Sequence, residues 1–218
     1  MSFGFAFDAA ACVGCQACVA ACLDASDLPA AYALRRVETH EYGSWIWEGG
    51  VPVPRGVGAF SVSIACNHCV RPACVAACPT GAMAKDPVTG IVAVADDVCV
   101  GCGRCARACP YGAIQVVPRA ADAPTGSGMA PGRQRSRRHA LKCDACRSLP
   151  EGPACAAACP MRCLAAGPIE ELRYRWGSTA QGPGLPDARL TQPNLAYGPP
   201  RGAYGSVPGT DSCEMPSV

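Results

Sequence analysis

Apolar residues in this chain come in short runs, separated by turn residues. The run Ile91–Val94 follows Asp-Pro and Thr-Gly turn signals at residues 86–90, so it predicts one strand of a short hairpin. Trp45 and Trp47 stand at alternate positions, as on one face of a strand, and are predicted to pack or to contact a partner. The pattern predicts an α+β fold built from short elements.

Small residues between neighbouring cysteines predict short helices. The third and fourth cysteines of each group have three residues between them, as in Cys18-Val19-Ala20-Ala21-Cys22, and one helical turn fits there. Proline follows the fourth cysteine at positions 79, 110 and 160 and should end the helix there. Leu23 takes that place in the first group, so its helix is expected to continue through Asp24.

Two stretches are rich in proline and glycine. Ala120–Arg138 is predicted to be a linker, and its arginines either form a solvated loop or contact an acidic partner or anionic lipid headgroups; they are Arg133, Arg135, Arg137 and Arg138. From Thr179 onward, 13 of the last 40 residues are proline or glycine. We expect this tail to be extended and to order only against a partner.

Cysteine is the main source of candidate chemistry, with 18 cysteines among 218 residues. Disulfides are disfavoured because neighbouring thiols recur two residues apart. Zinc is disfavoured because its sites rarely supply a third and a fourth cysteine followed by proline. Aromatic residues make up only 6% of the chain, so the organic core is thin and we expect bound metal to hold the fold together.

Sixteen of the cysteines form four groups of four with the spacing of iron–sulfur ligands. Groups one and three have the C-x2-C-x2-C-x3-C spacing of bacterial ferredoxins, and groups two and four lengthen a single gap. The groups predict four 4Fe-4S clusters and are, in order, Cys12-Cys15-Cys18-Cys22, Cys66-Cys69-Cys74-Cys78, Cys99-Cys102-Cys105-Cys109 and Cys143-Cys146-Cys155-Cys159.

The groups are predicted to pair as two nested ferredoxin-like units. In two-cluster ferredoxins the fourth cysteine of each group ligates the other cluster. Groups two and three match best, since Cys-Pro-x-Gly-Ala begins at the fourth cysteine of both, so they form an inner unit and groups one and four an outer, split one. The predicted domains are residues 1–30 plus 140–175 (outer unit), 60–118 (inner unit), 119–139 (Arg-rich linker) and 176–218 (tail). The predicted ligand sets are Cys12, Cys15, Cys18 and Cys159 for cluster 1; Cys143, Cys146, Cys155 and Cys22 for cluster 2; Cys66, Cys69, Cys74 and Cys109 for cluster 3; and Cys99, Cys102, Cys105 and Cys78 for cluster 4.

A few residues near the ligands leave alternatives open. Lys142 and Arg71 either tune a cluster or point to water. His68 is predicted to pack or to form hydrogen bonds, because all four cysteine positions of its group are filled. Cys163 and Cys213 belong to no group and are predicted to be small hydrophobic residues, although Cys163 could back up a ligand.

The chain shows no stretch long and apolar enough to span a bilayer, and Met1–Ala11 has no export-signal pattern. A formal charge of +2 provides no basic face for nucleic acid. We therefore expect association with a membrane only through partners, on a side that the sequence does not fix.

The local motifs resemble those of a known family. The residues that carry the resemblance are Cys66-Asn67-His68-Cys69, Cys78-Pro79-Thr80-Gly81-Ala82-Met83, Cys143-Asp144-Ala145-Cys146 and Cys159-Pro160-Met161-Arg162. Over roughly residues 5 to 195 the chain is similar to the iron–sulfur electron-transfer (B) subunit of the dimethyl sulfoxide reductase family of molybdopterin oxidoreductases.

That resemblance implies a non-catalytic subunit of anaerobic respiration. It would relay single electrons between a quinol-oxidising membrane anchor and a molybdopterin-containing catalytic subunit. Cluster 1 would lie nearest the catalytic subunit, and cluster 4 would face the membrane. The alternative is a free soluble polyferredoxin that carries electrons by diffusion.

Overall fold

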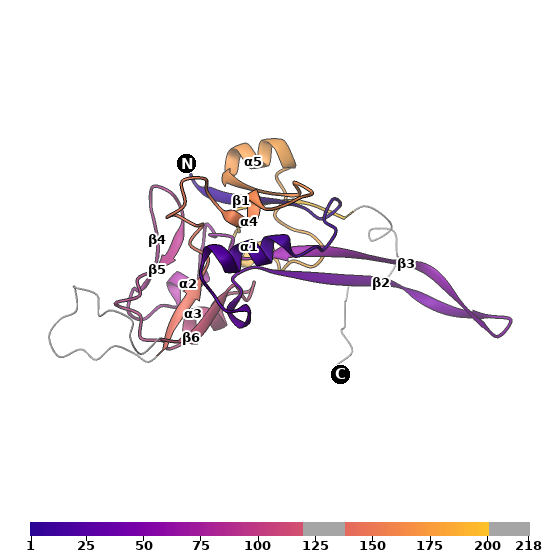
Figure 1. The fold of residues 1–218 in the computed structure, drawn as a ribbon, viewed down its shortest axis with the longest axis horizontal. Helices are drawn as coiled ribbons and strands as arrows, with labels where there is room; N and C mark the ends of the chain where they lie inside the picture. The colour runs from indigo at the N-terminus through magenta and orange to yellow at the C-terminus, as the bar shows by residue number, and fades with distance from the viewer. Residues whose placement is uncertain (120–137, 201–218) are drawn as a thin grey trace.

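The structure is a computed structural model that describes residues 1–119 and 138–200 (Figure 1). It confirms a mixed α+β fold with short helices. The helices are α1 (Ala17–Ala25), α2 (Ala73–Ala76), α3 (Arg104–Ala108), α4 (Ala154–Ala157) and α5 (Ile169–Trp176), with 3-10 turns η1 (Ala30–Tyr32) and η2 (Ala188–Leu190). The strands are β1 (Phe3–Asp8), β2 (Arg36–Glu48), β3 (Val51–Ile64), β4 (Met83–Lys85), β5 (Val92–Val94), β6 (Ile114–Pro118), β7 (Arg138–Lys142), β8 (Leu164–Pro168) and β9 (Leu195–Gly198).

Each of the helices α1 to α4 carries the third cysteine of one group, as the small residues predict. Helix α1 continues past Cys22 to Ala25, which confirms the expectation drawn from Leu23. Helix α1 packs against α4 and α2 packs against α3. The helices of groups one and four are therefore neighbours, and so are those of groups two and three.

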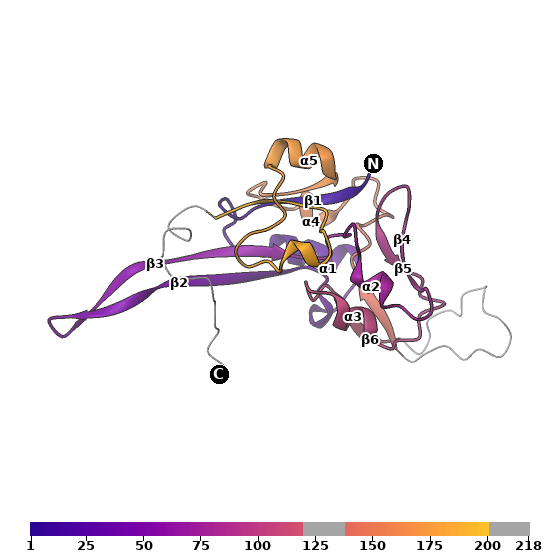
Figure 2. The same ribbon diagram turned by 180° about the vertical axis from the view of Figure 1, so that it is seen from behind.

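Two hairpins flank these helices. The short one pairs β4 with β5, with Met83 opposite Val94, and confirms the strand predicted over residues 91–94. The long one pairs β2 with β3 and projects away from the rest of the molecule as an arm (Figures 1 and 2). A register shift between Tyr42 and Ser44 interrupts its pairing, and Gly43 there has a φ of +107°, which favours glycine.

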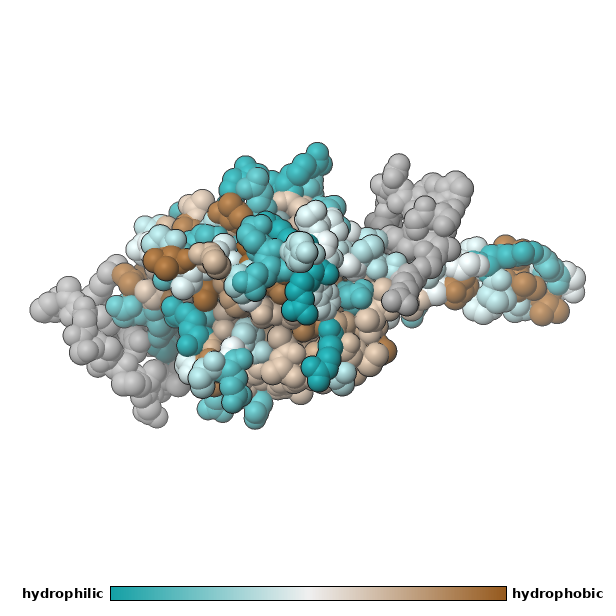
Figure 3. Space-filling view, turned by 90° about the horizontal axis from the view of Figure 1, so that it is seen from above, coloured by the Kyte–Doolittle hydropathy of each residue, from teal (hydrophilic) through white to brown (hydrophobic). Residues whose placement is uncertain are grey.

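Trp45 and Trp47 lie on the arm as a strand, but they do not pack inside the molecule. Their exposed fractions are 64% and 73%. Hydrophobic residues are visible at the far end of the arm in Figure 3. Internal packing of the two tryptophans is therefore wrong, and partner contact stays a prediction.

Strand β1 is the middle strand of a sheet with the order β8-β1-β9. It runs antiparallel to β8 and parallel to β9, and helix α5 packs against it. Phe5 and Tyr197 from this sheet are buried in the main core. The expectation that the tail orders only against a partner is thus wrong for the part up to residue 200, because β9 and Asn194 are held by the rest of the protein itself.

Strands β6 and β7 join the predicted inner and outer units. Ile114 pairs with Lys142, and Pro118 pairs with Arg138. Arg138 and His139 therefore belong to a strand, although their composition predicts a linker. The other three arginines of that run (Arg133, Arg135 and Arg137) and Cys213 lie outside the described residues.

Cysteines are part of the core. Cys22, Cys66, Cys143 and Cys155 pack with the aromatic and aliphatic residues of the main core, and Cys74 and Cys105 pack with Met83 and Ile114 in a second one. Among the described helices, none is long and apolar enough to cross a membrane.

Candidate metal centres

The first candidate centre is a small cavity beside the base of the arm. Five cysteines from two distant segments line it, and four of them are the predicted ligands Cys12, Cys15, Cys18 and Cys159. Val37 and Ser63 from β2 and β3 line it too, and Cys18 Sγ lies 3.5 Å from Ser63 Oγ. The structure therefore brings together the four residues predicted for cluster 1.

Cys163 is a fifth cysteine in that cavity. It is buried, and its Sγ lies 3.5 Å from Cys159 Sγ. Its burial in the main core fits the small hydrophobic residue that the sequence predicts, and its place beside Cys159 fits the alternative of a back-up ligand, so both predictions stand.

The second centre surrounds Cys22 at the end of the first group. Burial raises the pKa of the Cys22 thiol to about 11, and negative charge on Cys155 and Cys146 adds to that effect. Burial also raises the pKa of Cys143 to about 12. Cys22, Cys143 and Cys155 belong to the same buried core, and Cys146 acts electrostatically on Cys22, so the four residues predicted for cluster 2 lie in one region.

The third centre is the group Cys66, Cys69, Cys74 and Cys109. Burial raises the pKa of the Cys74 thiol to about 12, with further increases from the charges of Cys66, Cys109 and Cys69. The charge of Cys66 also raises the pKa of Cys143, so the second and third centres are adjacent.

The fourth centre is a cavity lined by Cys78, Cys99, Cys102 and Cys105. Two backbone amides point at its sulfur atoms, because Met83 N donates to Cys78 Sγ at 3.3 Å and Ala140 N donates to Cys99 Sγ at 3.4 Å. Burial opposes the Cys78 thiolate, yet hydrogen bonds from the backbone N–H groups of Met83, Thr80 and Ala82 and from the Thr80 hydroxyl hold the pKa of Cys78 below its usual value. A sulfur that accepts N–H groups in this way is prepared to act as a thiolate ligand.

The donor sets fit iron–sulfur clusters. All seventeen described cysteines are free thiols. Burial raises the pKa of many of them, so the positive charge of bound iron is what would keep them as thiolates. Within residues 1–119 and 138–200 no His, Cys, Asp and Glu side chains gather closely enough to hold a single metal ion. In a 4Fe-4S cluster each of the four cysteines binds a different iron atom, so its ligands do not converge on one point.

Solvent exposure differs between the centres. Cys15 in the first and Cys102 in the fourth are exposed, whereas the cysteines of the second and third are buried or half-buried. The two middle centres are therefore enclosed, and the two outer centres reach the surface.

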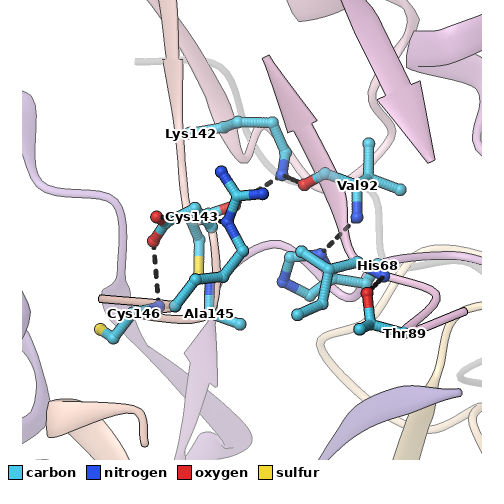
Figure 4. Close-up of polar contacts among 10 residues, drawn as sticks. His68, Thr89, Val92, Lys142, Cys143, Ala145 and Cys146 are labelled. Atoms are coloured by element: carbon cyan, nitrogen blue, oxygen red, sulfur yellow. Dashed lines mark hydrogen bonds and ion pairs between the residues drawn. The ribbon is translucent and has the colours of Figure 1, made fainter. Parts of the chain in front are cut away.

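The structure places the three residues near the ligands for which the sequence left alternatives open, His68, Lys142 and Arg71. His68 is fully buried, accepts a hydrogen bond on Nδ1 from Val92 N at 3.0 Å, and lies edge-on to Phe3, which confirms a packing and hydrogen-bonding role (Figure 4). Burial, together with the charge of Lys142, lowers the pKa of His68 to about 2. Lys142 points inward, while Arg71 is exposed and donates to the carbonyl oxygen of Arg189 at 2.6 Å.

Arg35 is the residue that sequence reasoning missed. It is only 2% exposed, stands immediately before β2, and interacts electrostatically with Cys155, Cys143 and Cys18. Its neighbour Arg36 has a side chain that is 41% exposed. Two adjacent arginines carry no sequence signal that tells which one turns inward.

Family models for iron–sulfur proteins match the segments that carry the first three cysteine groups. Residues 57–123 match the model of a 4Fe-4S dicluster domain, and residues 9–25 match a 4Fe-4S binding domain. The protein is 40% identical over 200 residues to YnfG of Escherichia coli, a probable anaerobic dimethyl sulfoxide reductase subunit, covering 90% of this sequence and 88% of YnfG.

Two further relatives extend the comparison. The B subunit of anaerobic dimethyl sulfoxide reductase from Haemophilus influenzae is 39% identical over 213 residues, covering 96% of this sequence and 94% of the relative. The electron transport protein HydN of Escherichia coli is 35% identical over 160 residues, covering 72% of this sequence and 83% of HydN.

Proposed function

This protein belongs to the family of anaerobic dimethyl sulfoxide reductase B subunits, which are non-catalytic electron-transfer subunits with 4Fe-4S domains, and we propose that it relays single electrons through four clusters. The relay would connect a quinol-oxidising membrane anchor with a molybdopterin-containing catalytic subunit. What supports this proposal is that cysteines from different groups line shared cavities, Cys159 with those of group one and Cys78 with those of group three, while Cys22 and Cys109 interact electrostatically with cysteines of groups four and two.

The proposed ligands of each cluster are the sets described above: Cys12, Cys15, Cys18 and Cys159 for cluster 1; Cys22, Cys143, Cys146 and Cys155 for cluster 2; Cys66, Cys69, Cys74 and Cys109 for cluster 3; and Cys78, Cys99, Cys102 and Cys105 for cluster 4. The packing of α1 on α4 and of α2 on α3 supports two nested ferredoxin-like units. In that scheme residues 60–118 form the inner unit, and residues 1–30 with 140–175 form the outer one.

The order of the relay is proposed to run from cluster 1 to cluster 4. Arg35 lies between the ligands of the first two clusters, and Cys66 and Cys143 bring the second and third together. Exposed cysteines occur only at the two ends, at Cys15 and Cys102, within the described residues. Electrons would therefore enter and leave at clusters 1 and 4, with cluster 1 toward the catalytic subunit.

Bound clusters would supply reversible one-electron chemistry, and the protein would control it by environment. The buried cysteines of the middle centres exclude water. Backbone N–H groups such as that of Ala145, which donates to Cys143 Sγ at 3.3 Å, favour the more negative reduced state and so raise the potential. No bond of a substrate is made or broken on this protein.

A subunit of a complex is favoured over a freely diffusing carrier by the arm. Trp45 and Trp47 are mostly exposed at its far end, and exposed aromatic residues of this kind are typical of protein contacts. The test is copurification of the tagged protein followed by mass spectrometry. A stable association with a molybdopterin-containing protein supports the complex, and a monomer that passes alone through gel filtration supports the carrier.

The ligand assignment is tested by single Cys→Ser variants, with iron analysis and electron paramagnetic resonance (EPR). Cys78→Ser should remove the signal of the cluster that Cys99 binds, not that of its own group. Cys74→Ser is the matched variant in the same group and should remove the other signal. Loss of the same signal in both variants would contradict the exchange of fourth ligands.

A further inference from the structure

Arg35 is a positive charge in the interior of the protein. Its side chain is 2% exposed, its Nη1 donates to Ser63 Oγ at 2.9 Å, and its guanidinium carbon lies 5.0 Å from the centre of the Phe5 ring. Among the described residues no carboxylate pairs with it, and its Nε has no hydrogen-bond partner. The described part of the protein therefore supplies no acidic counter-charge.

A buried guanidinium without an anion is strongly unfavourable. Arginine does not lose its proton in proteins, so it cannot escape the cost of burial by becoming neutral. A charge of this kind persists where another negative group compensates for it. The candidates are the groups that surround Arg35.

Those groups are thiols of two different proposed clusters. Ser63 Oγ, which accepts from Arg35, also lies 3.5 Å from Cys18 Sγ, a proposed ligand of cluster 1. Burial works against the charge of Arg35, yet its pKa lies above the usual value because of the negative charges of Cys155, Cys143 and Cys18. Cys155 and Cys143 are proposed ligands of cluster 2, so Arg35 lies at the junction of the two.

Lys142 repeats this arrangement at the next junction. It is 5% exposed, and its Nζ donates to the carbonyl oxygens of Val92 and Cys143 (Figure 4). Its positive charge favours the thiolate of Cys74 in cluster 3 and that of Cys143 in cluster 2. In the described part of the sequence no aspartate or glutamate is buried, so both buried cations lie among thiols.

We propose that Arg35 is a shared counter-charge of clusters 1 and 2, which offsets their negative charge and raises the reduction potential of both. The inference rests on the proposed function, because it takes the ligand sets from there. Reduction makes a cluster more negative, so a fixed cation beside its ligands stabilises the reduced state more than the oxidised state. A cation between two clusters acts on both, and keeps their potentials raised together.

The test compares Arg35→Gln, which removes the charge, with Arg35→Lys, which keeps it. Both are made in the full-length protein within its native complex, and Arg55→Gln on the exposed arm is the matched control. Redox titration followed by EPR measures the potentials, with each signal assigned beforehand by one ligand variant per cluster. In Arg35→Gln, clusters 1 and 2 should become harder to reduce by at least tenfold in the one-electron equilibrium, which is about 59 mV.

The other variants define the result further. Arg35→Lys should stay within threefold of the wild type, and cluster 4 should be unchanged in every variant. Full iron content with unchanged potentials in Arg35→Gln overturns the inference. If the glutamine variant fails to load iron and the lysine variant loads it, the charge is needed for assembly, which supports the inference. If both fail to load, the role of Arg35 is structural and the inference is wrong.

The wild type separates this inference from the proposed function. Fewer than four assigned clusters in the wild type would overturn the ligand scheme and the inference with it. If four clusters are assigned and Arg35→Gln changes the reduction potential of none of them, the inference is wrong and the proposed function stands.

Discussion

Asn194 provides the sharpest test of how the described part of the tail is held. Its side chain is 1% exposed, and its Nδ2 donates to Ser2 Oγ at 2.8 Å, to the carbonyl oxygen of His68 at 2.9 Å and to that of Phe3 at 3.1 Å. One side chain thus connects the segment before β9 with β1 and with a loop between two ligands. We predict that Asn194→Ala releases β9 without unfolding the rest of the protein.

The size of the effect follows from the hydrogen bonds. The Nδ2 group has two hydrogens shared among three acceptors, so we count two bonds with a net value of about 1 kcal/mol each. A loss of about 2 kcal/mol in the local opening free energy corresponds to about 30-fold, because about 1.4 kcal/mol is tenfold. Amide hydrogen exchange of Ala196 and Tyr197 should therefore accelerate about 30-fold.

The assay is hydrogen exchange followed by mass spectrometry on the iron-loaded protein under anaerobic conditions. Asn194→Asp should accelerate exchange more than Asn194→Ala, because a carboxylate cannot donate and would face the two carbonyl oxygens. Gln181→Ala is the control, since it removes one exposed hydrogen bond that Gln181 Oε1 accepts from Ala188 N, and it should change exchange in β9 less than about fivefold. Exchange in Asn194→Ala within threefold of the wild type would refute the reasoning.

Three further predictions concern the centres and the arm. Gly101→Ala should lose cluster 4, because φ is +65° and an added Cβ would overlap the carbonyl group of Arg138. Gly81→Ala is the matched variant, and it should keep its iron at a cost of only about 1 to 2 kcal/mol of backbone strain, because φ is +71° but nothing lies within 4 Å of the added Cβ. Equal iron content in the two variants would contradict this prediction. The double variant Trp45→Ser with Trp47→Ser should leave iron content unchanged and reduce copurification of the partner at least tenfold. Unchanged recovery of the partner would rule out the arm as its contact. Removal of iron by an anaerobic chelator should abolish cooperative thermal unfolding, because buried thiols replace aliphatic residues in both cores; a cooperative transition in the iron-free protein would show that the core is sufficient without metal.

The sequence predicts the short helices around the cysteines well because cysteine spacing is a local signal. A third cysteine followed by three mostly small residues favours a helical turn, and this is why α1 to α4 lie where they were expected. The extension of α1 to Ala25 follows from the missing proline at Leu23. These features depend on neighbours within a few residues.

Burial of single polar residues depends on distant contacts and was not predictable in the same way. Arg35 and Arg36 differ by one position, and only pairing of β2 with β3 decides which of them faces the thiols. The tail shows the same limit. Its proline and glycine content is typical of an extended segment, but Leu195 and Tyr197 find a preformed strand edge on β1. The composition of the tail shows that it cannot form a core by itself, but it carries no information about the strand β1, which is far away in sequence and pairs with it.

The place of β1 in the middle of its sheet has a consequence for biosynthesis. Its two neighbours, β8 and β9, are made long after it, and the last residue of β9 is Gly198. At about 5 to 20 residues per second, β1 waits roughly 10 to 40 s for its second neighbour during translation. Until β8 is made, Phe3, Phe5 and Phe7 are part of an unpaired apolar strand, and until β9 is made one edge of that strand stays open, so it is prone to join other chains. The nascent protein therefore needs protection at its beginning, and Cys12, Cys15 and Cys18 must wait for Cys159 before their proposed ligand set is complete.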